Sequence, residues 1–362
     1  NLENTLKAFL IKILFKESLL VPPDKIDFTK IKRILVVRQH DPMGDVLIST
    51  VIIPNLKKAF PDSELDVIAR PQLSEKDIFI KSPVIKEVIV FIKKEFFSPF
   101  RIFSFIKMIK AKKYDLAIVA GSTSVSFTSL LISYLSGAPV RVGYDGEFFG
   151  KKLYTKAFLT TPVPYDATVI KHQALRNLDI LTYINIPVVN KEHYMHITEA
   201  EKEAESEKMK QNGISKSADI IIGMHLGANV LSNRWPVERF AELSDVLAGN
   251  SRNKIIVFYG KKESGLAEEF KRISNNKVFI QEPIPLRRFA AMLSLLDVFI
   301  CNDTGVLHVA AAVGTSTVAI FGPTDPEQWN PLGEKHLWVR NEEKKVLSIR
   351  MEEVLQKVKE LL

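Results

Sequence analysis

The sequence predicts an α/β protein with two halves, each built around a parallel β-sheet. Short apolar runs of strand-like composition alternate with longer helical patterns along the chain, as in sheets whose faces are covered by helices. A charged stretch at residues 199–210 separates two such series. Polar turns follow several apolar runs, and the carboxyl ends of parallel strands are where such folds bind ligands.

The first half is expected to cover residues 1–188. Its apolar runs predict strands at residues 34–38, 64–69, 88–91 and 116–120, and helical spacing predicts a helix at 46–60. The basic, apolar segment 101–113 is expected to form a helix that connects two strands.

The second half, residues 189–362, resumes the alternation. Its strands are expected at residues 219–224, 255–259, 277–280, 297–300 and 317–321, and its helices at 237–247 and 306–313. A closing helix from residue 348 could pack back on the first half.

Composition predicts a cytoplasmic protein of about two domains. The chain has 362 residues, of which 46% are hydrophobic, and this is enough to bury two cores. Cys301 is the single cysteine, which excludes an intrachain disulfide framework and a cysteine-rich metal site and is typical of a reducing compartment. No apolar run approaches the roughly 20 residues needed to span a bilayer.

A formal net charge of +8 favours an acidic partner such as a nucleotide or a phosphorylated lipid. Residues 2–14 place apolar side chains at helical spacing against Lys7, Lys12 and Lys16. Such a helix can lie on an anionic membrane, although it more often packs on its own protein, and segment 101–113 has the same two interpretations. Aromatic residues do not interleave with the basic ones as in a nucleic-acid platform, so nucleic acid is excluded as a partner.

The strongest binding signal lies in a turn between an expected strand and an Ala-rich helix of the second half. Asp303, Thr304 and Gly305 occupy this turn, where the free N–H groups and the positive dipole of a helix N-terminus bind anions. On the helix, His308 would face the turn. A helix cap without any ligand is the alternative interpretation.

Further polar turns are expected at the same sheet edge. The turn after the strand at 317–321 contains Thr324, and the loop 260–262 follows another strand. The segment after the strand at 219–224 contains Gly227, Asn229, Asn233 and Arg234. Amide and guanidinium groups donate hydrogen bonds to phosphate oxygens. Together these turns predict a pocket for a nucleotide diphosphate.

Asp45 is the candidate catalytic residue of the first half, at the start of the first long predicted helix. It is either an acid that complements the helix dipole or a general base that takes the proton of an acceptor hydroxyl. Gly44 would allow an acceptor to approach the backbone, and Arg38 could bind an anionic acceptor or Asp45 itself. His40 and Asp41, in the same loop, are secondary candidates.

Several common sites are excluded by the sequence. The chain lacks the Gly-x-Gly-x-x-Gly fingerprint and the Walker lysine loop, which argues against a NAD-dependent dehydrogenase and a P-loop. No His or carboxylate cluster has metal-ligand spacing, so neither a metal nor another cofactor is predicted.

Three segments together resemble the bacterial ADP-heptose lipopolysaccharide heptosyltransferases of glycosyltransferase family 9. They are residues 43–47, residues 227–236 ending in Arg-Trp-Pro, and residues 302–308 followed by 321–324. The likeness spans about residues 32–345. It implies a GT-B fold of two Rossmann-like domains facing across a cleft. It also implies metal-independent, inverting transfer of a heptose from ADP-heptose to a Kdo- or heptose-bearing lipid A acceptor, with the donor bound mainly by the second half. Peripheral contact with the cytoplasmic face of the inner membrane stays open beside the expected cytoplasmic location.

By position, the resemblance implies that Asp45 is the general base and that Asp303, Thr304, Gly305 and His308 belong to the donor site. Many members carry a lysine at the place of Asn233, so here Arg234 would supply the charge. Four alternatives stay open: a transferase for another nucleotide sugar, one with a protein acceptor, a nucleotide-sugar 2-epimerase, and a non-catalytic nucleotide-sugar-binding protein.

Overall fold

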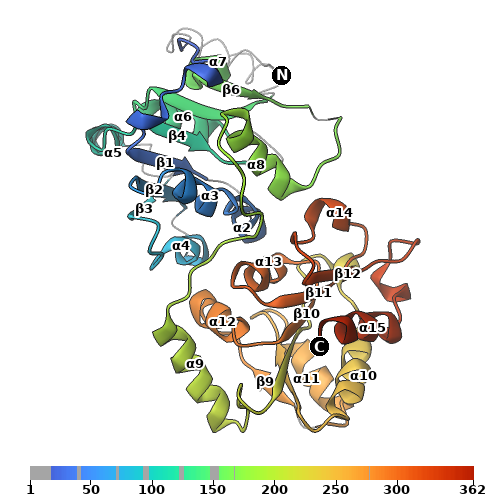
Figure 1. The fold of residues 1–362 in the computed structure, drawn as a ribbon. Coiled ribbons are helices and arrows are strands. Elements are labelled where there is room, and N and C mark those ends of the chain that lie inside the picture. Colours follow the sequence, from blue (N-terminus) through green and yellow to red (C-terminus); the bar gives the residue numbers. More distant parts are fainter. Residues whose placement is uncertain are drawn as a thin grey trace. The chain divides into compact units, whose positions relative to one another are not determined.

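A computed structural model describes residues 18–38, 42–70, 73–92, 98–121, 126–146, 155–166, 168–276 and 278–362. The chain divides into two compact units, Asn1–Lys191 and Glu192–Leu362. Each unit is a β-sheet flanked by helices (Figure 1). The helix predicted at residues 2–14 lies outside the described residues. None of the described helices is long and apolar enough to cross a membrane.

Six parallel strands form the sheet of the first unit, in the order β3-β2-β1-β4-β5-β6. The strands are β1 (Arg33–Val37), β2 (Glu64–Ala69), β3 (Glu87–Val90), β4 (Leu116–Val119), β5 (Val140–Asp145) and β6 (Thr161–Pro164). The helices are η1 (Pro23–Lys25), η2 (Phe28–Lys30), α2 (Met43–Ser49), α3 (Ile52–Ala59), α4 (Leu73–Phe79), α5 (Pro99–Ala111), α6 (Phe127–Leu135), α7 (Thr155–Phe158) and α8 (Gln173–Tyr183). The apolar residues of β1 and β4 are all buried, as expected for parallel strands covered on both faces.

The sheet of the second unit also has six parallel strands, in the order β12-β11-β10-β7-β8-β9. The strands are β7 (Ile220–His225), β8 (Asn253–Phe258), β9 (Phe279–Gln281), β10 (Val298–Asn302), β11 (Ser316–Ile320) and β12 (His336–Val339). The helices are α9 (Glu199–Gln211), η5 (Leu231–Asn233), α10 (Val237–Ala248), α11 (Ser264–Ile273), α12 (Leu286–Leu293), α13 (Gly305–Ala312), α14 (Pro326–Trp329), η6 (Val346–Ser348) and α15 (Met351–Leu361). The prediction of an α/β fold with two parallel sheets is confirmed.

Both sheets have the doubly wound strand order of Rossmann-like domains, counted from the first strand of each unit. In this order the connections change direction between the first and fourth strands, and the crevice at their carboxyl ends binds ligands. These strands are β1 and β4 in the first unit and β7 and β10 in the second. The turn with Asp45 follows β1, and the turns with Gly227 and Asp303 follow β7 and β10. The topology therefore brings Asp45 to the carboxyl edge of the first sheet, and Gly227 and Asp303 to the carboxyl edge of the second.

Some predicted elements differ from the structure. The predicted helix 46–60 is two helices, α2 and α3, because Pro54 has no N–H to donate and its ring would clash with the Thr50 carbonyl in a continuous helix. Strands β5, β6 and β12 were not predicted. Strand β6 contains Pro162 and Pro164, which only an edge strand tolerates, and it does lie at the edge of its sheet.

The core of the second unit includes the closing helix. Trp235 is fully buried, and its indole N–H donates to the Ile349 carbonyl at 2.9 Å. The buried side chains of α15, among them Val354 and Val358, belong to this same core. Cys301 is also buried, in β10, and burial raises the pKa of its thiol.

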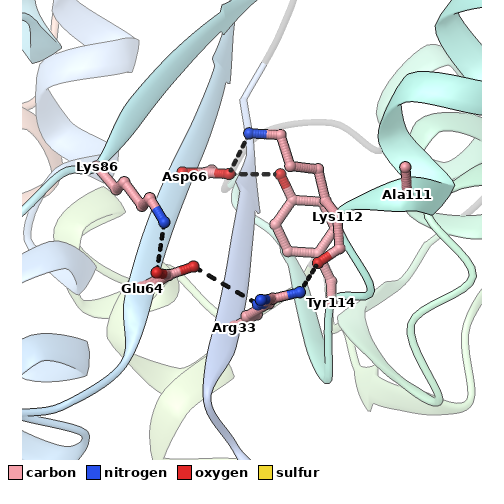
Figure 2. Close-up of a pocket in the computed structure, with 7 residues that line it drawn as sticks. All are labelled: Arg33, Glu64, Asp66, Lys86, Ala111, Lys112 and Tyr114. Atoms are coloured by element: carbon pink, nitrogen blue, oxygen red, sulfur yellow. Dashed lines mark hydrogen bonds and ion pairs between the residues drawn. The ribbon is translucent and has the colours of Figure 1, made fainter.

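A polar cluster closes the amino edge of the first sheet, around a cavity of about 230 Å³ (Figure 2). We call it the amino-edge cluster; it consists of Arg33, Glu64, Asp66, Lys86, Lys112 and Tyr114. The Tyr114 hydroxyl donates to Asp66 at 2.7 Å, and burial, reinforced by Asp66, raises the pKa of Tyr114. Lys112 pairs with Glu87 and, at 3.5 Å, with Asp66; its hydrogen bond to Glu87, reinforced by Asp66, raises the pKa of Lys112 and keeps it charged. With Glu87 counted, the three cations of the cluster face three carboxylates, and the charges neutralise one another.

His336 in β12 makes the stability of the second unit depend on pH. It is buried, its Nδ1 lies 2.9 Å from the Thr317 hydroxyl, and burial lowers its pKa from 6.5 to about 4. The unfolded chain therefore takes up a proton first, so stability is complete above pH 6.5 and is lost as the pH falls toward 4. The loss attributable to His336 is roughly 3 kcal/mol.

Urea titrations at pH 7.0, 5.5 and 4.5, followed by tryptophan fluorescence, measure this loss, because Trp235, Trp329 and Trp338 all lie in the second unit. Burial also lowers the pKa of His225, so only the difference between the parent and His336→Gln reports on His336. An equal pH slope in the two proteins would contradict the prediction.

Candidate functional site

Asn302 joins three segments at the carboxyl edge of the second sheet. It is fully buried as the last residue of β10. Its amide oxygen accepts from the Trp235 N–H at 2.9 Å, and its amide nitrogen donates to the carbonyls of Leu226 at 3.1 Å and Gly227 at 3.0 Å. The turn after β7 and the segment before α10 are therefore both fixed to β10.

The N-terminus of α13 has no side-chain cap. Thr304 is its N-cap with extended backbone (φ −151°), but the side chain makes no capping hydrogen bond. The Thr304 hydroxyl is buried and has no hydrogen-bond partner among the described residues. The first N–H groups of α13, which starts at Gly305, carry the positive end of the helix dipole. A ligand oxygen at this turn could accept from these N–H groups and from the hydroxyl.

Three predicted residues from three different segments meet beside this turn. The Asn233 amide donates to the Asp303 carboxylate at 3.3 Å and to the Thr324 hydroxyl at 3.4 Å. Burial raises the pKa of Asp303, although its hydrogen bond with Thr324 opposes the shift. A carboxyl group with a raised pKa is neutralised more easily, so it repels a neighbouring anion less.

Arg234 is held on the turn after β7. Its Nη2 donates to the Ala228 carbonyl at 2.9 Å and lies 3.4 Å from Glu263 Oε1, while its Nε is buried without a partner among the described residues. Glu263 Oε2 accepts from the Gly260 N–H at 2.8 Å and occupies the space beside Gly227. A Cβ at residue 227 would lie 1.7 Å from that oxygen, so only glycine at this position leaves room for the Glu263 carboxylate.

A mainly apolar pocket of about 210 Å³ adjoins the α13 turn. It is lined by His225, Phe258, Tyr259, Gly260, Lys261, Gln281, Glu282, Pro283, Ile284, Phe289 and Val306. Val306 is the second residue of α13, so the pocket lies next to the helix N-terminus. Burial lowers the pKa of His225, which keeps its ring neutral. The pocket can take a flat, weakly polar ring.

Two predicted donor residues lie at the margin of this arrangement. His308 is buried on α13, with its ring 5.2 Å from the ring of His193. Asn229 is exposed on the turn after β7. In the loop 260–262, Gly260 and Lys261 line the apolar pocket.

Asp45 is the third residue of α2, at the carboxyl edge of the first sheet, and the preceding Gly44 is buried. Arg38 is 4% exposed, and its guanidinium donates to the Ala120 carbonyl at 3.1 Å and to the Asp45 carbonyl at 3.3 Å. Arg38 therefore ties the start of α2 to the end of β4. His40 and Asp41 lie outside the described residues.

Within the described ranges, no group of three or more His, Cys, Asp or Glu side chains could hold a metal ion.

Comparison with known proteins identifies the family. A family model described as glycosyltransferase family 9 (heptosyltransferase) matches residues 102–359. Lipooligosaccharide heptosyltransferase 2 of Haemophilus influenzae is 23% identical over 318 residues, which cover 85% of this chain and 88% of that protein.

Two solved structures share the fold over most of their length. The glycosyl transferase family 9 protein of Veillonella parvula aligns with a TM-score of 0.78 and 22% identity, covering 91% of this chain and 97% of that one. The E. coli ADP-heptose lps heptosyltransferase II aligns with a TM-score of 0.71 and 23% identity, covering 91% and 98%. Since the family model matches more than half of the sequence, the chain belongs to glycosyltransferase family 9, the heptosyltransferases, and is a glycosyltransferase with the GT-B fold.

Proposed function

We propose that this chain transfers a heptose from ADP-heptose to a hydroxyl of the lipopolysaccharide inner core, with inversion and without a metal ion. The observation that carries the proposal is the uncapped N-terminus of α13 next to an apolar pocket of about 210 Å³ in the second unit. A diphosphate fits the helix N-terminus, and a nucleobase fits the apolar pocket. The names of the relatives, a lipooligosaccharide heptosyltransferase and an ADP-heptose enzyme, support this choice of donor and acceptor. The cytoplasmic location predicted from the sequence is part of the same proposal.

The fixed groups around α13 would carry the charge of the leaving ADP. The helix N–H groups and the Thr304 hydroxyl would donate to phosphate oxygens, and Arg234 would supply the positive charge in place of the lysine that Asn233 replaces. His308 on α13 would also contact the donor, as would Thr324 and Asn229 on the neighbouring turns. These groups stabilise a diphosphate without a metal ion, which is why we propose a metal-independent reaction.

Asp45 would act as the general base in a single displacement. The acceptor hydroxyl attacks the anomeric carbon, the bond from that carbon to the β-phosphate oxygen breaks, and the hydroxyl proton passes to the Asp45 carboxylate. One displacement inverts the anomeric configuration. Arg38 would position Asp45 by holding its backbone carbonyl, which lies 3.3 Å from the guanidinium, and the buried Gly44 would leave room for the acceptor.

The test is to incubate the purified full chain with ADP-heptose, with and without a Kdo-bearing lipid A acceptor, and to measure ADP release and the mass of the acceptor. We expect ADP and a heptosylated acceptor only when both substrates are present. Donor isomerised without acceptor would indicate an epimerase, and ADP binding without turnover would indicate a binding protein. No binding of ADP-heptose would overturn the choice of donor, and other nucleotide sugars would then be tested.

Thr304→Val tests the phosphate site separately. The change keeps the side-chain shape and removes only a hydroxyl that makes no capping bond, so we expect unchanged stability. A hydrogen bond to a charged group contributes about 1.5–3 kcal/mol, so the Kd for ADP should rise about tenfold or more. Calorimetric titration measures the Kd. Thr315→Val is the matched control, because the Thr315 hydroxyl donates instead to the Leu293 carbonyl at 2.7 Å. An unchanged Kd in Thr304→Val would place the phosphates elsewhere.

A further inference from the structure

Helix α5 of the first unit presents apolar side chains on two opposite faces. Its inner face packs on the core of the unit through the buried Ile109 and the half-buried Phe105 and Met108. Its outer face carries Phe100 and Phe103, whose side chains are 80% and 67% exposed. The two rings are one helical turn apart and form an exposed apolar patch, and contiguous exposed patches mark sites of contact with proteins or membranes.

The outer face is also basic. Positions 100, 103, 107 and 110 form one stripe along the helix, so the exposed Lys107 and Lys110 continue the line of the two phenylalanines. The exposed Lys113 follows directly after the helix, and no acidic residue occurs from residue 99 to residue 113. The stripe therefore combines aromatic side chains at one end with positive charge at the other.

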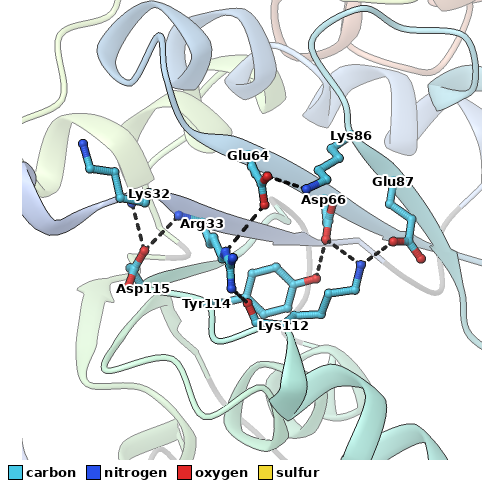
Figure 3. Close-up of polar contacts among 9 residues, drawn as sticks. All are labelled: Lys32, Arg33, Glu64, Asp66, Lys86, Glu87, Lys112, Tyr114 and Asp115. Atoms are coloured by element: carbon cyan, nitrogen blue, oxygen red, sulfur yellow. Dashed lines mark hydrogen bonds and ion pairs between the residues drawn. The ribbon is translucent and has the colours of Figure 1, made fainter.

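Contacts of the amino-edge cluster hold the residues that directly follow α5 (Figure 3). Arg33 donates to the Lys112 carbonyl at 2.9 Å, immediately after the helix, and Lys112 pairs with Asp66 and Glu87. Tyr114, two residues further on, donates to Asp66. Rotating α5 to bury Phe100 and Phe103 would break these contacts, so the fold keeps both rings exposed.

We propose that the outer face of α5 docks on an anionic lipid bilayer. A basic helix with exposed aromatic side chains lies in the plane of such a surface, with its rings among the acyl chains and its lysines at the headgroup phosphates. A second copy of the chain is a poorer partner, because two identical basic stripes would repel each other. The inference rests on the proposed function in one respect, because the lipid-linked acceptor of that function lies in a membrane.

The test measures co-sedimentation of the full chain with vesicles of phosphatidylethanolamine and phosphatidylglycerol, and with vesicles of phosphatidylcholine alone. We expect binding to the anionic vesicles only, weakened by added salt. Phe100→Ser with Phe103→Ser should weaken binding at least tenfold. Lys107→Gln, Lys110→Gln and Lys113→Gln together should weaken it about 100-fold, since each lysine near an anionic surface contributes about fivefold. Leu347→Ser, which removes a 71% exposed apolar side chain beside Lys344 and Lys345, is the matched control and should bind like the parent.

Two outcomes would overturn the inference: no binding of the parent to anionic vesicles, or equal binding by the parent and both α5 variants. Transfer to a water-soluble, deacylated acceptor separates this inference from the proposed function. Full transfer by the α5 variants on that acceptor shows that they fold, so a loss of vesicle binding then reports on docking. A parent that binds vesicles but transfers nothing to either acceptor would contradict the proposed function and leave the docking surface standing.

Discussion

Replacing Asp45 with Asn should lower kcat for heptose transfer by about 10²- to 10⁴-fold, because the acceptor hydroxyl would lose its general base. Asn keeps the shape of the side chain and cannot take up the proton. The Kd for ADP should not change, because the groups assigned to the nucleotide all lie in the second unit. ADP release at saturating acceptor gives kcat, and calorimetric titration gives the Kd.

Asp62→Asn is the matched control, since Asp62 is an exposed aspartate in a turn of the same unit, and it should leave kcat unchanged. The pH profile adds a second readout. The kcat of the parent should rise with pH as the base ionises, and the kcat of Asp45→Asn should not show this rise. A kcat for Asp45→Asn within twofold of the parent would show that another group removes the proton.

Replacing Asn302 with Leu should damage both the stability and the ligand site of the second unit. The change removes three hydrogen bonds and leaves the Trp235 N–H and the carbonyls of Leu226 and Gly227 without their buried partner. We expect the free energy of unfolding to fall by about 3–5 kcal/mol, since each unsatisfied buried group costs about 1–3 kcal/mol. The Kd for ADP should rise at least tenfold, because the turns that carry Gly227 and Arg234 lose their anchor.

Asn253→Leu separates the two effects. Asn253 lies at the amino end of β8, and its amide donates to the Leu247 carbonyl at 2.9 Å. This variant should lose about 1 kcal/mol of stability and bind ADP like the parent. Urea titration by tryptophan fluorescence and calorimetric titration below the unfolding range measure both quantities. If Asn302→Leu keeps the parent Kd, the turns hold their geometry without Asn302.

The alternation of apolar runs predicted most strands of both sheets, because buried parallel strands are almost wholly apolar. It failed where a strand does not have that composition. Strand β5 contains Arg141, whose buried guanidinium donates to the Phe158 and Ala138 carbonyls at 2.6 Å, and no local pattern reveals such partners. Strand β6 carries two prolines at a sheet edge, and whether a strand lies at an edge is a property of the whole topology.

The candidate site shows the same division between local and long-range information. The place of Asp303, Thr304 and Gly305 at a helix N-terminus could be predicted, because capping depends on neighbouring residues. The apolar pocket could not, since it combines Phe258, Ile284 and Phe289 from separate segments, and the strand before two of them was expected at residues 277–280 rather than Phe279–Gln281. The role of Asn302 was equally hidden, because its partners lie 67 to 76 positions away in the sequence.

The burial of Cys301 has a practical consequence for measuring motion in this enzyme. Its thiol is inaccessible and its pKa is raised, so it should not react with maleimides while the protein is folded. Cysteines introduced as Phe100→Cys in one unit and Leu347→Cys in the other would then be the only reactive thiols. A fluorophore pair or two spin labels at these positions would report the distance between the units before and after ADP-heptose is added, without any need to replace Cys301 in β10.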